Sequence, residues 1–104
     1  MILAGLGIMH RFKVVVIGDE LSHGKPHPLP YLEGLRITGA APERSVAFED
    51  SRSGVQSASA AGIATVGMRT GLGHDDLVAA GAVMTADHFD AGELMEMLAA
   101  KMGW

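Results

Sequence analysis

The sequence predicts an α/β fold built on a parallel sheet. Short runs of apolar, often β-branched residues alternate with segments of helical length along the 104 residues. Glycine or proline follows most of these segments, where a strand or helix has to end. Hydrophobic residues make up 48% of the sequence and charged residues 19%, which is enough apolar material for one core. At this length we expect a single domain covering residues 1–104.

The first expected strand covers residues 13–17, where every position after Lys13 is apolar, as in a strand that is covered on both faces. A turn rich in glycine and proline follows at residues 22–30, and a helix then continues to about Thr38. We expect this helix to bury one apolar face, which is made by Leu29, Tyr31, Leu32 and Leu35.

The rest of the chain continues the same alternation. Expected strands cover residues 45–48, 63–67 and 83–84, and expected helices cover residues 54–61, 75–80 and 91–102. Strands and helices that alternate in this way form a parallel sheet with right-handed crossover connections. Such sheets bind ligands beyond the carboxyl ends of the strands, so the loops of interest are residues 18–27, 49–54 and 67–74.

Charge and composition exclude several classes of function. The net charge is −4 and the eight basic residues are scattered singly, so we expect no nucleic-acid partner. No apolar stretch reaches the ~20 residues of a membrane helix. The apolar segment 1–9 precedes the first positive charges, which is the reverse of a secretory signal. The absence of cysteine fits a reducing compartment, and we expect a cytoplasmic protein without a membrane partner.

Two adjacent carboxylates, Glu49 and Asp50, follow the expected strand at residues 45–48. Their place at the carboxyl edge of the sheet suits Mg²⁺, which takes one or two protein carboxylates and completes its shell with water and phosphate oxygens. Asp50 or Ser51 also fits the N-cap of the following helix, which is the commoner role for these residue types. Capping does not explain Glu49, so both interpretations stay open.

Lys25 lies in the loop before the first expected helix, at the same edge of the sheet. A lysine in this place could offset charge on a phosphoryl oxygen or keep a catalytic carboxylate ionised. A solvated loop lysine is the alternative, and for a lysine taken alone it is the commoner one. Arg69 and His74 are weaker candidates for substrate contacts in the third loop.

Together these motifs resemble the haloacid dehalogenase superfamily of phosphohydrolases. The resemblance rests on Gly24-Lys25-Pro26-His27-Pro28, on Phe48-Glu49-Asp50-Ser51 about twenty residues later, and on Gly54 and Ala61-Gly62. It is specific for the branch of β-phosphoglucomutases, phosphoglycolate phosphatases and sugar-phosphate phosphatases, and it covers nearly the whole chain. The resemblance implies that Lys25 is catalytic and binds phosphate, that Glu49 and Asp50 bind Mg²⁺, and that Ser51 belongs to the phosphate-binding loop.

The same family has an Asp-x-Asp-x-Thr motif that supplies the attacking aspartate, and no such stretch occurs in this sequence. The resemblance therefore implies an incomplete, Rossmann-like core: its C-terminal half, without the cap domain and the first two core strands. In the family these two strands lie between the strands expected here at residues 13–17 and 45–48. We expect the chain alone to be inactive, because no aspartyl-phosphate forms without the nucleophile. We also expect self-association through exposed sheet edges.

The leading hypothesis is a magnesium-dependent phosphatase that hydrolyses a small phosphate monoester, such as a sugar phosphate or phosphoglycolate. A phosphomutase of the same branch is the nearest alternative, because the two share every motif present here. A non-catalytic module that binds phosphate or a protein partner is the alternative from another class. The substrate itself stays open, because in this branch the cap domain selects it.

Overall fold

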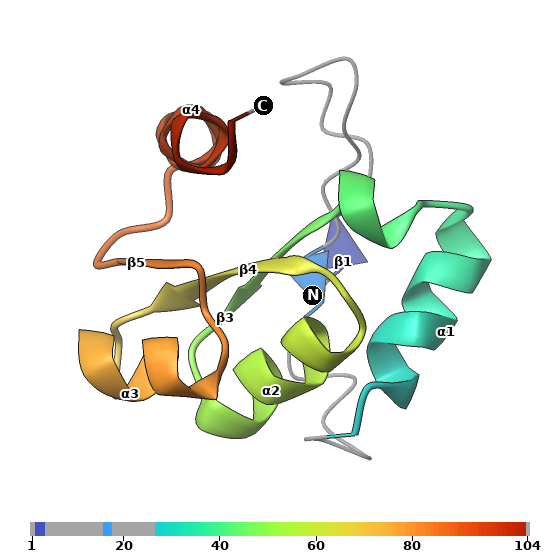
Figure 1. Ribbon diagram of the computed structural model, residues 1–104, viewed down its shortest axis with the longest axis horizontal. Helices are drawn as coiled ribbons and strands as arrows, with labels where there is room; N and C mark the ends of the chain where they lie inside the picture. Colours follow the sequence, from blue (N-terminus) through green and yellow to red (C-terminus); the bar gives the residue numbers. More distant parts are fainter. Residues whose placement is uncertain (1, 4–15, 18–26, 104) are drawn as a thin grey trace.

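The computed structural model describes residues 2–3, 16–17 and 27–103 (Figure 1). In chain order its elements are β1 (Ile2–Leu3), β2 (Val16–Ile17), α1 (Leu29–Thr38), the 3-10 turn η2 (Pro42–Arg44), β3 (Val46–Glu49), α2 (Arg52–Ala60), β4 (Ala64–Met68), α3 (His74–Ala80), β5 (Met84–Ala86) and α4 (Ala91–Met102). Strands β3, β4 and β5 form a parallel sheet in that order, and β1 and β2 form a separate antiparallel pair. The predicted α/β fold with a parallel sheet is confirmed.

Helices cover both faces of the parallel sheet. On one face Leu94, Met95 and Leu98 of α4 join residues of all three strands in one apolar cluster. On the other face α1 and α2 contribute Tyr31 and Ala58 to a second cluster. Figure 1 shows α4 and the pair α2 and α3 on opposite sides of the sheet. The sheet is therefore the middle layer of three, as expected for parallel strands.

Neighbouring residues of β3 are directed to opposite faces of the sheet, as in any β-strand. Val46 and Phe48 belong to the cluster under α4, whereas Ala47 belongs to the cluster under α1 and α2. Glu49 comes two residues after Ala47 and is therefore directed toward α1 and α2. Its side chain is buried there, with 4% of the residue exposed.

Helix α1 is present where the sequence predicts a helix, but it buries only part of the predicted apolar face. Leu29 and Leu32 are 54% and 44% exposed, whereas Tyr31 and Leu35 are buried. Burial is therefore confirmed for Tyr31 and Leu35 of the predicted face and was wrong for Leu29 and Leu32, because three-residue steps drift around a helix of about 3.6 residues per turn. Tyr31 and Leu35 are four residues apart and share one face. This face packs against the sheet.

The strand predicted at residues 13–17 is present as Val16–Ile17, and residues 13–15 lie outside the described part of the chain. Its predicted membership in the parallel sheet was wrong, because it pairs antiparallel with Ile2–Leu3. An antiparallel pair needs no crossover helix, so these two segments pair directly. The parallel alternation begins at β3. Among the described residues, β2 contacts β3 without sharing a sheet with it.

The other boundaries agree with the sequence predictions to within about two residues.

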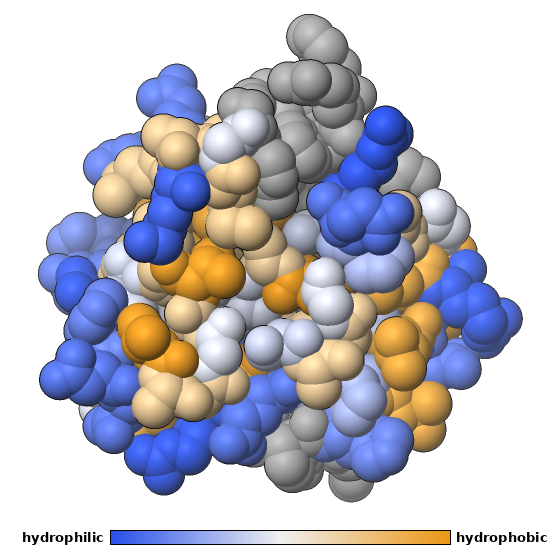
Figure 2. All heavy atoms as spheres, in the orientation of Figure 1, coloured by the Kyte–Doolittle hydropathy of each residue, from blue (hydrophilic) through white to orange (hydrophobic). Residues whose placement is uncertain are grey.

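Figure 2 shows hydrophilic side chains around much of the viewed face, with smaller apolar areas between them. On α1, Arg36 lies 2.8 Å from Glu33, and its hydrogen bond and charge lower the pKa of Glu33. Both side chains are exposed, so this pair adds little to stability. Among the helices that the structure describes, none has the length and apolar character to cross a membrane.

Candidate functional site

The carboxyl ends of the three parallel strands bring polar side chains to one edge of the sheet. Asp50 follows β3, Arg69 and Thr70 follow β4, and Asp87 and His88 follow β5. Parallel strands that run in register end at the same edge, and here Glu49 of β3 lies opposite Gly67 of β4. This is the edge at which α/β sheets bind ligands.

Asp50 is exposed at this edge. The Thr70 hydroxyl donates a long hydrogen bond of 3.4 Å to Asp50 Oδ2, so the turns after β3 and β4 contact each other. Asp50 lines an open depression of about 670 Å³. The other residues that line it are Ser51, Arg52, Ser53, Gln56, Gly71 and Leu72. The Asp50 carboxylate is thus accessible to a solute next to the first turn of α2.

Glu49 has a different environment, although it is the chain neighbour of Asp50. The Tyr31 hydroxyl donates a hydrogen bond to Glu49 Oε2, and both side chains are buried. The other carboxylate oxygen, Oε1, lies against Gly54, where any Cβ would overlap it. Glu49 therefore lies beneath the first turn of α2, and it does not line the depression next to Asp50.

Ser51 is the N-cap of α2. Its Oγ accepts a hydrogen bond of 3.0 Å from the backbone N–H of Gly54. This bond satisfies one of the N–H groups that have no partner within the first turn of a helix. The capping interpretation is confirmed for Ser51, and Asp50 is not the cap. A phosphate contact by Ser51 stays a prediction.

Lys25 lies outside the described residues. The described chain resumes at His27, whose backbone carbonyl accepts a hydrogen bond of 2.6 Å from Ser57 Oγ. His27 Nδ1 also accepts a hydrogen bond of 3.2 Å from the backbone N–H of Leu29. His27, two residues after Lys25, is therefore attached to α2, the helix that begins at the acidic edge.

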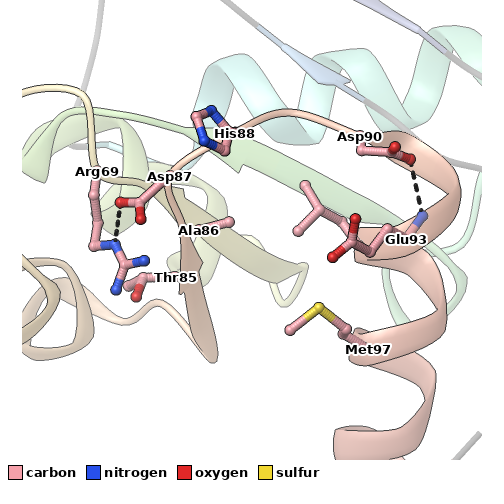
Figure 3. Close-up of a pocket in the computed structure, with 9 residues that line it drawn as sticks. Arg69, Thr85, Ala86, Asp87, His88, Asp90, Glu93 and Met97 are labelled. Carbon is pink, nitrogen blue, oxygen red and sulfur yellow. Dashed lines mark hydrogen bonds and ion pairs between the residues drawn. The ribbon is translucent and has the colours of Figure 1, made fainter.

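Arg69 and His74 contact the β5 side of the edge. Arg69 Nε lies 2.9 Å from Asp87 Oδ1, and His74 Nδ1 lies 2.7 Å from Thr85 Oγ1. Figure 3 shows Arg69 and Asp87 in a second hollow of about 230 Å³, between the end of β5 and the start of α4. No sequence motif predicted this hollow, because its walls come from separate segments that only the fold brings together. A substrate contact by Arg69 or His74 stays a prediction.

The side chains at this edge fit some, but not all, of the ligand positions of a magnesium site. Asp50 offers an exposed carboxylate, and Mg²⁺ takes one or two protein carboxylates. The Glu49 carboxylate instead accepts a hydrogen bond from the Tyr31 hydroxyl. Within residues 27–103 no group of three acidic or histidine side chains could hold an ion by itself. Asp50 thus fits as one ligand, with water, phosphate or other parts of the protein as the remaining ligands.

Comparison with known proteins identifies the family. Residues 1–68 match the family model of haloacid dehalogenase-like hydrolases. The chain is 37% identical over 78 residues to a phosphoglycolate phosphatase of Salmonella typhi, a match that covers 75% of this chain and 31% of that protein. It is 46% identical over 61 residues to a phosphorylated carbohydrates phosphatase of Thermotoga maritima, covering 59% and 28%. A solved haloacid dehalogenase family hydrolase of Deinococcus radiodurans, with bound phosphate and sodium, is 33% identical with a TM-score of 0.61, covering 77% of this chain and 36% of that one.

The chain therefore belongs to the haloacid dehalogenase-like hydrolases, a family of enzymes. Within it, the chain falls in the branch that contains the phosphoglycolate and sugar-phosphate phosphatases. The matched region contains both motif segments, residues 24–28 and residues 48–51, so the resemblance inferred from them is confirmed. The chain spans about a third of the length of the curated relatives it matches.

Proposed function

We propose that this chain supplies the magnesium- and phosphate-binding edge of a phosphatase that hydrolyses a small phosphate monoester. The observation that carries the proposal is the placement of Asp50. It is an exposed carboxylate directly after β3, in an open depression beside the N-terminus of α2. Helix N-termini favour anions, so a cation held by Asp50 and a phosphate group would meet at this point.

Each motif residue has a part in the proposal. Asp50 is the metal ligand that this chain supplies, and Glu49 supports it from beneath the first turn of α2. Ser51 fixes that turn by capping it. Lys25 offsets negative charge on the phosphoryl group. Magnesium, when bound, would neutralise charge on the phosphoryl oxygens during transfer.

The relatives support the class of substrate. One is a phosphoglycolate phosphatase, another is a phosphorylated carbohydrates phosphatase, and the Deinococcus structure has bound phosphate. A small phosphorylated metabolite is therefore the proposed substrate. The sequence has no Asp-x-Asp-x-Thr motif, so we propose that the attacking aspartate comes from another segment or chain.

A complementation assay tests the proposed function. The chain is mixed with the part of the Salmonella relative that precedes the matched region, and phosphate release from phosphoglycolate is measured with and without Mg²⁺. We expect hydrolysis only from the mixture and only with Mg²⁺. Asp50→Asn should lower the rate at least about tenfold. Asp87→Asn is the matched control, because it removes an exposed acid at the same edge.

Two results would contradict the proposal. One is an equal rate for Asp50→Asn and the unchanged chain. The other is a stable complex of the two parts that releases no phosphate in the presence of Mg²⁺. Transfer of phosphate to a second position of a sugar, without release, would instead assign the phosphomutase alternative.

A further inference from the structure

Tyr31 connects α1 to the end of β3, at the point where the chain leaves the sheet toward Asp50. Its side chain is fully buried, and its hydroxyl donates a hydrogen bond to Glu49 Oε2. A phenylalanine would fill the same apolar cluster, so packing alone does not explain the hydroxyl. A buried carboxylate is costly unless it is hydrogen-bonded, and Tyr31 supplies a hydrogen bond to Glu49.

Helix α2 closes the other side of Glu49. Oε1 lies against Gly54, and a Cβ on this glycine would also come within 2.9 Å of Ser51 Oγ. The N–H of Gly54 donates to that same Ser51 Oγ at 3.0 Å. Gly54 therefore contacts both Glu49 and Ser51, the two residues that flank Asp50 in the turn.

A second contact attaches the start of α1 to the same helix. Ser57 of α2 lies three residues after Gly54 and donates its hydroxyl to the backbone carbonyl of His27. Tyr31 comes four residues after His27, near the start of α1. The short segment from His27 to Tyr31 is thus fixed to α2 at one end and to β3 at the other.

We propose that Tyr31 is a positioning residue for the Asp50 site. Its hydroxyl holds the Glu49 carboxylate beneath the first turn of α2. Glu49 is then an internal anchor of the turn, and Asp50 alone faces the depression as a ligand. The consequence for metal affinity rests on the proposed function, whereas the order of the turn at residues 49–54 is measurable without a metal.

The experiment compares two variants of α1 in the full chain. Tyr31→Phe removes the hydroxyl and keeps the ring. Leu35→Val removes apolar contacts from the same helix and cluster and leaves the hydroxyl in place. Amide hydrogen exchange of residues 50–54 reports the order of the turn, and titration with Mg²⁺ alone reports the affinity of the site. Both are measured where all variants are folded.

We expect Tyr31→Phe to speed exchange at Gly54 and to weaken Mg²⁺ binding, each by about tenfold, the size of effect found when an outer partner of a metal site is removed. Leu35→Val should change neither by more than about twofold, because the hydrogen bond to Glu49 is intact. Glu49→Gln should weaken Mg²⁺ binding less than Asp50→Asn, since the amide oxygen still accepts a hydrogen bond from Tyr31.

Unchanged exchange at residues 50–54 in Tyr31→Phe would overturn the proposal, and so would an equal loss of order in Leu35→Val. A loss of Mg²⁺ binding in Glu49→Gln as large as in Asp50→Asn would also overturn it, because Glu49 would then be a ligand. If Tyr31→Phe loosens the turn but the unchanged chain binds no Mg²⁺, the positioning role stands and the proposed function fails.

Discussion

Glu49 and Asp50 are joined by one peptide bond and have different surroundings. Glu49 is the last residue of β3 and shares a face of the sheet with Ala47, so its carboxylate lies under α1 and α2. Asp50 lies beyond the strand and is exposed. A buried carboxylate depends on the donors that the fold gives it, whereas an exposed one stays available to a cation. The two acids at this edge therefore differ in their accessibility to a cation.

Gly54→Ala tests the close contact between α2 and Glu49. The new Cβ would overlap the Glu49 carboxylate, which has to move away from Tyr31 to make room. Losing that buried hydrogen bond outweighs the helix propensity that alanine gains, so we expect a net destabilisation of about 1–2 kcal/mol in urea unfolding. Gly71→Ala is the control, because a Cβ there meets no atom within 4 Å. Equal stability of Gly54→Ala and the unchanged chain would contradict the close contact.

At the scale of elements, the turn from β3 into α2 supports the candidate site. The strand delivers the chain to the edge, and Ser51 then caps the helix, so the backbone on both sides of Asp50 is hydrogen-bonded. The predicted burial of Leu29 and Leu32 in α1 was wrong, because leucine spacing alone does not show which side of a helix meets a sheet. The sequence predicts Tyr31 as part of the apolar face of this helix, and its pattern does not show that the Tyr31 hydroxyl reaches Glu49.

Ser51→Ala tests the contribution of the cap. Removing Oγ leaves the backbone N–H of Gly54 without its side-chain acceptor, and we expect the free energy of unfolding to fall by about 1 kcal/mol. Ser53→Ala is a matched control within the same turn of α2, where alanine favours the helix. An equal change in the two variants, measured by urea unfolding, would show that the hydroxyl of Ser51 does not cap the helix.

At the scale of the molecule, local sequence patterns predicted the parallel sheet. They did not predict the pairing between segments that are distant in the sequence. Strands β3 to β5 and their helices follow from runs of apolar residues and the turns between them. The pairing of Ile2–Leu3 with Val16–Ile17 joins two segments whose own sequences do not specify a partner. Every residue of β3 is buried, and β2 contacts this strand. Self-association through a sheet edge stays a prediction. Among the described strands of the parallel sheet, β3 and β5 each have one ladder partner, β4.

We propose that the carboxyl edge of the sheet binds Mg²⁺ and phosphate, and an NMR titration of the chain with Mg²⁺ and inorganic phosphate tests this binding. We predict that the largest shifts fall on Asp50, Ser51 and Thr70, around the depression at the end of β3. The same titration of Asp50→Asn should leave these resonances in place. Shifts centred on Asp87 and Glu93, in the hollow beside α4, would contradict the account, and so would the absence of any shift.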